Sequence, residues 1–201
     1  CYRFPGSTRP PMKANAPTVL APGPLVLAVL ILLAALSRLL PHPPNFSPVE
    51  AIALFGGACF ASRAWAFAVP MLALLASDLV MAAVIGDSYA GYLGSMSFWS
   101  VYACIALTTL MGLRLRGRAG GARLLGYSLA GSVLFFLVTN LAAWIASPFY
   151  PQTAAGLAAA YVAGVPFFQW TVLGTLAYVA ILFGGFALLR RRLPVLAAQT
   201  A

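Results

Sequence analysis

The sequence predicts an all-α integral membrane protein, built as a bundle of six transmembrane helices. Hydrophobic residues make up 62% of the 201 residues and charged residues only 7%, whereas soluble domains are about 45–50% apolar and about 25% charged. The apolar residues gather in six segments, and the basic residues lie at the ends of these segments. Helices are the expected spans, because a helix satisfies its own backbone hydrogen bonds within a bilayer.

The net charge of +9 comes from 12 basic and 3 acidic residues. In a soluble chain this balance would favour nucleic-acid binding, but no basic face here alternates with exposed aromatic residues. We therefore expect no nucleic-acid partner, and assign the basic residues to orientation in the lipid bilayer.

The first segment, residues 24–40, is long enough to span when a few flanking residues are included. A signal peptide is the competing interpretation. Ala34-Ala35-Leu36-Ser37 is a poor cleavage site, and the segment leads directly into a proline-rich turn. Both observations favour a membrane span.

The second segment, residues 49–60, follows four prolines within residues 41–48, each of which fixes its φ angle. Ser47-Pro48-Val49-Glu50 has the pattern of a capping box, with Ser47 at the N-cap, Pro48 first in the helix and Glu50 reaching back. This accounts for Glu50 without a functional role.

The remaining segments are residues 65–86, 97–113, 124–145 and 170–189. The third of the six segments contains Ser77-Asp78, the fifth contains Asn140, and the last ends at three arginines. The membrane domain is thus expected at residues 24–192, between a flexible N-terminal tail of residues 1–23 and a C-terminal tail of residues 193–201. Residues 1–11, which begin with Cys1 and precede Met12, are expected to be upstream or fragmentary sequence, and no role is assigned to Cys1.

The basic residues predict the orientation of the bundle. With the N-terminus in the cytoplasm, eleven of them fall on the cytoplasmic side, and Arg38 alone lies at the outer end of a helix, where it can snorkel to the interface. The eleven are Arg3, Arg9, Lys13, Arg63, Arg114, Arg116, Arg118, Arg123, Arg190, Arg191 and Arg192. We expect both termini in the cytoplasm and a multi-pass protein of the bacterial inner membrane.

The outer loops, residues 41–48, 87–92 and 147–169, are expected to form a ligand site, because long structured loops on one face are commonly functional. The third is expected to hold a weakly apolar helical patch between two proline turns. The expected ligand-binding residues, in these loops and the outer halves of the helices, are Asp78, Asn140, Trp144, His42, Asn45, Phe46, Tyr89, Tyr92, Tyr150, Phe168 and Gln169.

Each candidate also has a structural interpretation. Asp78 is the strongest, because an ionisable group in a span marks a functional site by default, although hydrogen bonds from Ser77 and a neighbouring helix would also hold it. Asn140 is equally suited to joining helices. The tyrosines and tryptophans lie where an aromatic belt is expected, and His42 is either a titrating or metal-binding group or merely a polar loop residue.

Two cysteines fall within the membrane segments. Cys59 lies beside Gly56-Gly57, where small residues indicate close helix packing, and Cys104 lies at the predicted depth of Asp78. Buried cysteine is usually inert packing, but either thiolate is a possible ligand of a soft metal.

We expect no enzymatic activity and no intrinsic cofactor. The sequence has no Ser/His/Asp set, no phosphate-binding glycine loop and no clustered metal ligands. An intramembrane enzyme would need Asp78 and His42 close to a common point.

Four stretches carry a family resemblance: RLLPHPPNFSPVEAIALFGGACF (residues 38–60), Ser77-Asp78-Leu79, LVTNLAAW (residues 137–144), and residues 150–168 with YPQT, AGL and AGVPFF. They resemble a family of small bacterial six-helix membrane proteins that is similar to the S-components of energy-coupling-factor vitamin transporters. The BtuM-type cobalamin transporters are the nearest functional match, and the resemblance covers about residues 38–183.

The resemblance implies an S-component-like bundle whose outer loops clasp a vitamin-type ligand, with cobalamin as the first choice. It also implies a cysteine, Cys104 or Cys59, as axial ligand of the cobalt. One departure concerns the first helix, where Ala28, Ala34 and Ala35 do not form the Ala-x-x-x-Ala pattern of S-components that dock an energising module. This departure favours solitary action over a partner ATPase module.

Two functions from different classes are therefore expected. The first is a transport protein that captures a small molecule at the outer face. The alternative is a non-transporting scaffold or assembly protein whose outer loops bind a protein partner. A carrier predicts a concave, aromatic-lined cavity under the outer loops, and a scaffold predicts packed loops with an exposed apolar patch.

Overall fold

The structure is a computed structural model that describes residues 22–193 and residue 196. In this part of the chain all regular secondary structure is helical. The expected N-terminal tail lies almost entirely outside the described residues, as do Cys1, Met12 and most of the C-terminal tail. The elements are α1 (Pro22–Leu36), η1 (Ser37–Leu39), α2 (Val49–Cys59), α3 (Arg63–Ile85), α4 (Asp87–Ala90), α5 (Met96–Leu113), α6 (Gly121–Ala146), α7 (Ala154–Val179), η2 (Ala180–Gly184) and α8 (Gly185–Arg192).

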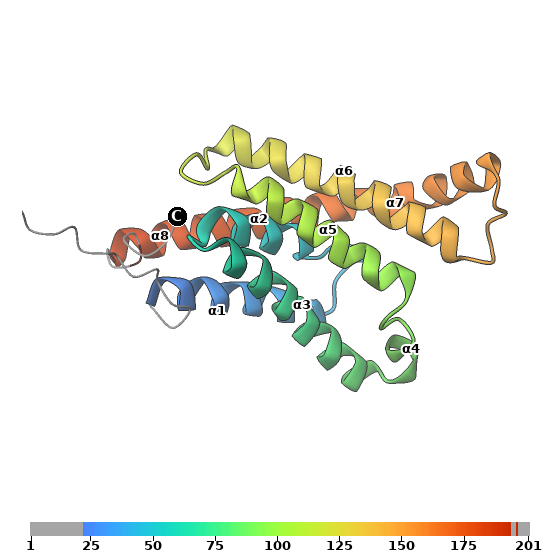
Figure 1. The fold of residues 1–201 in the computed structure, drawn as a ribbon, viewed down its shortest axis with the longest axis horizontal. Helices are drawn as coiled ribbons and strands as arrows, with labels where there is room; N and C mark the ends of the chain where they lie inside the picture. Colours follow the sequence, from blue (N-terminus) through green and yellow to red (C-terminus); the bar gives the residue numbers. More distant parts are fainter. Residues whose placement is uncertain (1–21, 194–195, 197–201) are drawn as a thin grey trace, which may run out of the picture.

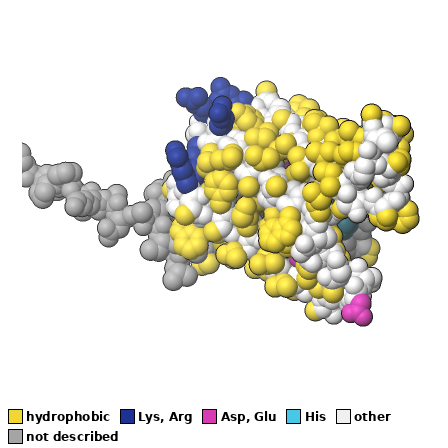
Figure 2. Space-filling view, turned by 45° about the vertical axis from the view of Figure 1, so that its right-hand side comes forward, with side chains coloured by type: hydrophobic (Ala, Val, Ile, Leu, Met, Phe, Trp, Pro, Cys, Tyr) yellow, Lys and Arg dark blue, Asp and Glu magenta, His cyan; other side chains and the backbone are white. Residues whose placement is uncertain are grey.

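The helices run back and forth along one axis and form a bundle with two distinct ends (Figure 1). The basic side chains visible in Figure 2 gather at one end of the molecule. We call this the basic end; the α5–α6 connection and the end of α8 lie there (Figure 1). The other end, which we call the loop end, carries the segments that join α1 to α2, α3 to α5, and α6 to α7 (Figure 1).

Five helical stretches of the described chain are long and apolar enough to cross a membrane. They are Pro22–Leu39, Arg63–Ile85, Met96–Leu113, Gly121–Ala146 and Ala154–Arg192. The prediction of an all-α, multi-pass membrane protein is therefore confirmed, since helix length and hydropathy both meet the requirement.

The predicted second span is instead a short central helix. α2 has 11 residues, which make it about 16 Å long at 1.5 Å per residue, against about 30 Å for the hydrocarbon core. Every residue of α2 is buried, and α2 packs against α1, α3, α5, α6 and α7. The expectation of six spans is corrected to five long helices of the described chain that pack around α2.

Glycines let α2 approach its neighbours closely. A Cβ added at Gly112 of α5 would lie 2.6 Å from the carbonyl oxygen of Leu54, and one added at Gly57 would overlap the carbonyl oxygen of Thr109. On the opposite side, a Cβ at Gly56 would lie 2.6 Å from the ring of Pro70. Small residues at these crossings allow backbone-to-backbone packing, as in other membrane helix pairs.

The predicted capping box is wrong. The N-cap of α2 is Pro48, it makes no side-chain cap hydrogen bond, and the helix begins one residue later than expected. The Glu50 side chain does not reach back to the start of the helix; it is 2% exposed and lies inside the bundle. Because the loop before α2 packs into the bundle, the first turn faces protein on all sides, and Glu50 has no access to solvent.

The third predicted loop, residues 147–169, is also mostly helical. α7 begins at Ala154, where the Thr153 side chain accepts a hydrogen bond of 3.2 Å from the Gly156 amide. Pro166 lies inside α7, which continues through the π-helical turn η2 to Arg192. Proline is tolerated within membrane helices because neighbouring groups satisfy the freed carbonyl. The loop is therefore residues 147–153, and the α6–α7 hairpin extends past the other helices at the loop end (Figure 1).

Candidate functional site

An ion pair lies near the loop end of the bundle, between η1 and α3. Nη1 of Arg38 is 2.6 Å from Oδ1 of Asp78, and the two side chains are 14% and 2% exposed. The expectation that Arg38 snorkels to the interface is wrong, because its guanidinium turns inward to this carboxylate. Each charge offsets the cost of burying the other in apolar surroundings.

Two tyrosines complete the coordination of Asp78. The hydroxyl of Tyr89 donates to Oδ1 at 2.8 Å, and the hydroxyl of Tyr102 donates to Oδ2 at 3.0 Å. Nη2 of Arg38 donates to the Tyr89 oxygen at 3.2 Å. Asp78 thus joins η1, α4 and α5, and the neighbouring Ser77 hydroxyl ties α3 to the Ala35 carbonyl oxygen at 2.9 Å.

The environment of Tyr89 and Tyr92, in the α3–α5 connection, favours the neutral phenol. Burial raises the pKa of Tyr89 above its ordinary value; Asp78 raises it further, while Arg38 acts in the opposite direction. Burial likewise raises the pKa of Tyr92, and both Asp78 and Tyr89 add to the effect. A neutral phenol can donate to the carboxylate, whereas a phenolate would repel it.

A cavity of about 220 Å³ lies beside the ion pair. One part of its wall is polar and comes from Arg38 and the loop before α2, and the other part is apolar and comes from α2, α3, α5 and α6. Its lining residues are Arg38, His42, Asn45, Ser47, Val49, Met81, Tyr92, Val101 and Phe135. We call this the loop-end cavity.

The loop that covers the cavity is held by a tight turn. The amide of Phe46 donates to the Pro43 carbonyl oxygen at 3.0 Å, and Asn45 has a φ of 65°. Proline followed by a residue with positive φ is the pattern of a type II turn, in which asparagine is tolerated. The prolines and Asn45 therefore fix the part of the loop that faces the cavity.

His42 lies in the wall of this cavity. Its Nδ1 is 2.9 Å from the Pro43 carbonyl oxygen, and its Nε2 is 3.2 Å from the Arg38 carbonyl oxygen. Carbonyl oxygens only accept hydrogen bonds, so the ring donates to both only when both nitrogens are protonated.

Five of the residues expected at the ligand site lie together in or beside the cavity: His42, Asn45, Asp78, Tyr89 and Tyr92. Phe46 lies on the same loop, with its ring 5.9 Å from that of Tyr178 on α7. The loop-end site predicted from the sequence is thus partly assembled by the fold.

The other five expected ligand residues lie along the α6–α7 hairpin and do not line this cavity. Asn140 donates to the Phe136 carbonyl oxygen at 2.8 Å and packs against Gly164. The Trp144 indole donates to the Pro151 carbonyl oxygen at 3.0 Å. Phe168 stacks on Phe136, and Gln169 bonds its own helix at the Pro166 carbonyl oxygen. These contacts stabilise the hairpin, and Tyr150 lies half-buried in its connecting loop.

The two cysteines of the described chain are both buried and free. Cys59 lies at the basic end beside Phe186 and Arg190, and Cys104 lies within the bundle near Glu50. Neither lines the loop-end cavity. Within the described residues, no group of three or more His, Cys, Asp or Glu side chains is placed to hold a metal ion.

Sequence reasoning missed three polar residues inside the bundle. Arg38 was assigned to the interface, Glu50 to a cap, and Tyr102 to no role. The sequence did contain a signal for Arg38. It is the one basic residue of the described chain away from the basic end, and Asp78 is the one acidic residue inside a long span, so the two charges are expected to pair. Nothing in the spacing of Tyr102 shows that its hydroxyl reaches Asp78.

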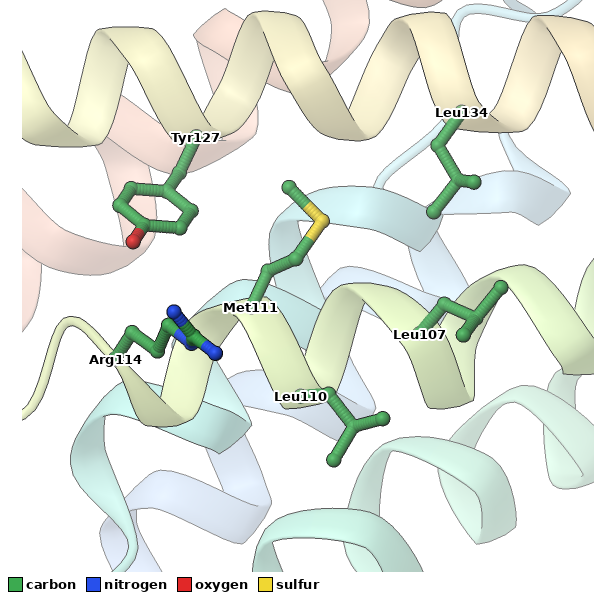
Figure 3. A pocket seen from close by; sticks show the side chains of 6 residues that line it. All are labelled: Leu107, Leu110, Met111, Arg114, Tyr127 and Leu134. Carbon is green, nitrogen blue, oxygen red and sulfur yellow. The ribbon is translucent and has the colours of Figure 1, made fainter.

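A separate groove lies on the side of the bundle, between α5 and α6. It has a volume of about 430 Å³, and Figure 3 shows leucines along it, with Arg114 and Tyr127 at one end. A second hollow of about 540 Å³ continues from these two residues to Arg118 and Arg123. This groove belongs to the basic end and is distinct from the loop-end cavity.

Residues 19–196, nearly the whole chain, match DUF6580, a family of unknown function. Among curated proteins and solved structures, none matches the chain. The resemblance to S-components therefore receives no support from these comparisons and stays a prediction. By the extent of its match, the chain belongs to the DUF6580 family of unknown function.

Proposed function

We propose that the protein is a membrane transport protein that captures a small ligand in the loop-end cavity. The observation that carries this proposal is the cavity itself, which has charged and amide groups on one wall and apolar side chains on the other. Concave sites with a few convergent polar groups in an apolar lining are typical of small-molecule binding.

The size of the cavity limits the ligand. A volume of about 220 Å³ corresponds to about seven water molecules at about 30 Å³ each, and lies below the roughly 300–1,000 Å³ of pockets for drug-sized ligands. Arg38 and Asn45 carry hydrogen-bond donors in the cavity wall, and Val101 and Phe135 present apolar surface. A single-ring or amino-acid-sized molecule with a carboxylate or carbonyl group fits this wall.

Cobalamin remains a prediction of the family resemblance, but it requires a wider site. It is larger than a drug-sized ligand, so residues 40–48 and the α4 region would have to part to admit it. Cys104 and Cys59 lie away from the cavity, so a thiolate bond to cobalt would require a second rearrangement. The compact ligand requires neither change.

The proposed orientation places the basic end in the cytoplasm of a bacterium and the loop end outside, with the chain in the inner membrane. The arginines of the basic end support it through the positive-inside rule. In this orientation the cavity takes its ligand from the outer side. Solitary action, without a partner ATPase module, is the simpler form of this S-component-like proposal.

The α6–α7 hairpin supports a second function, that of a scaffold that binds a protein at its loop end. The hairpin extends past the bundle (Figure 1), and Phe149 in its connecting loop is 87% exposed. Exposed apolar residues beyond the rest of the fold are typical of an interaction surface.

A thermal-shift screen of purified protein in lipid nanodiscs tests the capture function. The screen includes small carboxylated heterocycles, amino acids and cobalamin, because a ligand that binds the folded state raises its melting temperature. Met81→Trp fills the cavity, and Val84→Trp is the matched control on the exposed side of the same helix, where Val84 is 73% exposed. A compact ligand that stabilises wild type and Val84→Trp but not Met81→Trp supports the proposal, and stabilisation of all three equally contradicts it.

A further inference from the structure

Glu50 is a buried carboxylate whose two oxygen atoms have no partner in hydrogen-bond geometry among the described residues. Its side chain is 2% exposed. The hydroxyl oxygen of Thr108 is buried and unpartnered as well. Buried polar groups are normally hydrogen-bonded, so several such oxygens in one region require an explanation.

Glu50 and Thr108 lie close together. Both adjoin Gly131 of α6: a Cβ added there would lie 3.9 Å from the Glu50 Cβ and 3.9 Å from the Thr108 hydroxyl oxygen. Thr175 of α7 is also close enough to act on the carboxylate, and its hydroxyl accepts a hydrogen bond of 3.1 Å from Ser132. Oxygen-bearing side chains of α2, α5 and α7 therefore lie in the same region inside the bundle.

No positive side chain balances the Glu50 charge within the described chain. The groups that act on it are its own backbone and Thr175, and Cys104 of α5 is the nearby titratable group. α6 presents Gly131 and Ser132, and Arg38 of η1 is bound to Asp78. An uncompensated carboxylate inside a membrane protein is too costly to persist, so Glu50 requires a cation from outside the protein.

We propose that Glu50, with the hydroxyl oxygens of Thr108 and Thr175, binds a monovalent cation inside the bundle, either a proton or a sodium ion. One negative charge calls for one positive charge, and hard cations prefer oxygen ligands. The site lies next to the loop-end cavity, because Val49 precedes Glu50, and Phe135, in the cavity wall, is one helical turn from Gly131. The cation reaches the site from that side.

The test measures the melting temperature of wild type, Glu50→Gln and Asp87→Asn in nanodiscs at constant ionic strength. Asp87→Asn is the matched control, since it removes an exposed carboxylate at the loop end. If sodium binds, replacing potassium by sodium at about 100 times Kd raises the melting temperature of wild type and Asp87→Asn by about 5–10 °C and leaves Glu50→Gln unchanged.

If a proton binds, sodium has no effect, and wild type and Asp87→Asn lose stability as the pH rises, whereas Glu50→Gln does not. Identical sodium and pH responses in wild type and Glu50→Gln would overturn the proposal. If Glu50→Gln fails to fold, a second experiment replaces the comparison of melting temperatures. Wild type is treated with dicyclohexylcarbodiimide, and labelling of Glu50 is measured by peptide mass spectrometry. Labelling of Glu50 that is suppressed by sodium or by rising pH supports the site, and absent or invariant labelling overturns it.

A different observation carries a second site, in the groove between α5 and α6. Leu107, Leu110 and Leu134 line its apolar part (Figure 3), and Arg114, Arg118 and Arg123 surround the hollow at its basic end. The ion pair between Arg38 and Asp78 is the one found among the described residues, so these arginines have no acidic partner there. The geometry points to an anionic phospholipid, with its chains along the leucines and its phosphate among the arginines.

Nanodiscs of pure phosphatidylcholine, and of phosphatidylcholine with 20% of either phosphatidylglycerol or cardiolipin, test this lipid site. We expect anionic lipid to raise the melting temperature of wild type, and Arg118→Gln/Arg123→Gln to lose most of that increase. Arg191→Gln/Arg192→Gln, at the same end of the bundle, is the control for unspecific charge. Equal losses in the two double variants, or no effect of anionic lipid, would overturn the site, and a similar increase with free inorganic phosphate would show that the lipid chains do not take part.

Discussion

Arg38 and Asp78, forty residues apart in the sequence, are joined by a contact of 2.6 Å between Nη1 and Oδ1. This pair attaches the end of the first long helix to α3, and its Arg38 lines the loop-end cavity. Because both side chains are largely buried, the pair fixes the geometry of the loop end.

We expect either single substitution, Arg38→Gln or Asp78→Asn, to destabilise the protein by about 3–5 kcal/mol, since each leaves an uncompensated buried charge. The double variant Arg38→Gln/Asp78→Asn should lose much less stability than the sum of the losses in the two single variants. Thermal or denaturant unfolding of all four proteins measures this coupling, and additive losses would show that the two charges do not stabilise each other.

The crossing of α2 and α5 depends on glycine. Gly112→Val places a branched side chain where even a Cβ would lie 2.6 Å from the Leu54 carbonyl oxygen. We therefore expect the free energy of unfolding to fall by about 1–3 kcal/mol. Gly126→Val, on the open side of α6 with nothing within 4 Å of its Cβ position, is the control. Similar melting temperatures for the two variants would mean that α2 and α5 do not pack this closely.

The turn before α2 requires a residue that tolerates a positive φ. Asn45 has a φ of 65°, and this conformation costs a residue with a Cβ about 1–2 kcal/mol. Asn45→Gly should keep wild-type stability, whereas Asn45→Val should lower it and weaken ligand binding at the loop-end cavity. Equal melting temperatures for the glycine and valine variants would argue against this turn.

Alkaline pH should loosen the loop end. Because burial raises the pKa of Tyr89 and Tyr92 in the folded protein, their stabilising contribution is complete below the ordinary tyrosine pKa of about 10 and is lost as the pH rises above it. We expect Tyr89→Phe and Tyr92→Phe to reduce the loss of stability above about pH 10. Melting temperatures across that range measure the effect, with Tyr150→Phe as control; an unchanged pH profile in both variants would contradict the assigned environments.

Segment length and hydropathy were sufficient to predict the helices that face lipid, because spanning imposes a minimum apolar length. They gave the second segment as residues 49–60, close to α2, but did not predict that this helix is enclosed by the others and does not span, since a buried helix and a spanning helix have the same apolar composition. The continuity of α7 through Pro166 was also missed, because proline ends helices in water but is accommodated in a membrane bundle.

The candidate site was predicted in part. Asp78, His42 and Tyr89 were found because polar groups in an apolar chain stand out in the sequence. The role of Glu50 was misassigned, because the pattern Ser-x-x-Glu has an adequate local explanation. Only the packing of α5, α6 and α7 around the first turn of α2 shows that this side chain faces inward.

Equilibrium binding of the best ligand from the thermal-shift screen, by isothermal titration calorimetry in nanodiscs, tests the loop-end cavity most directly. The account predicts saturable one-to-one binding of a compact ligand to wild type and Val84→Trp, with at least a tenfold weaker affinity in Met81→Trp. Unchanged affinity in Met81→Trp would contradict the claim that the ligand occupies this cavity.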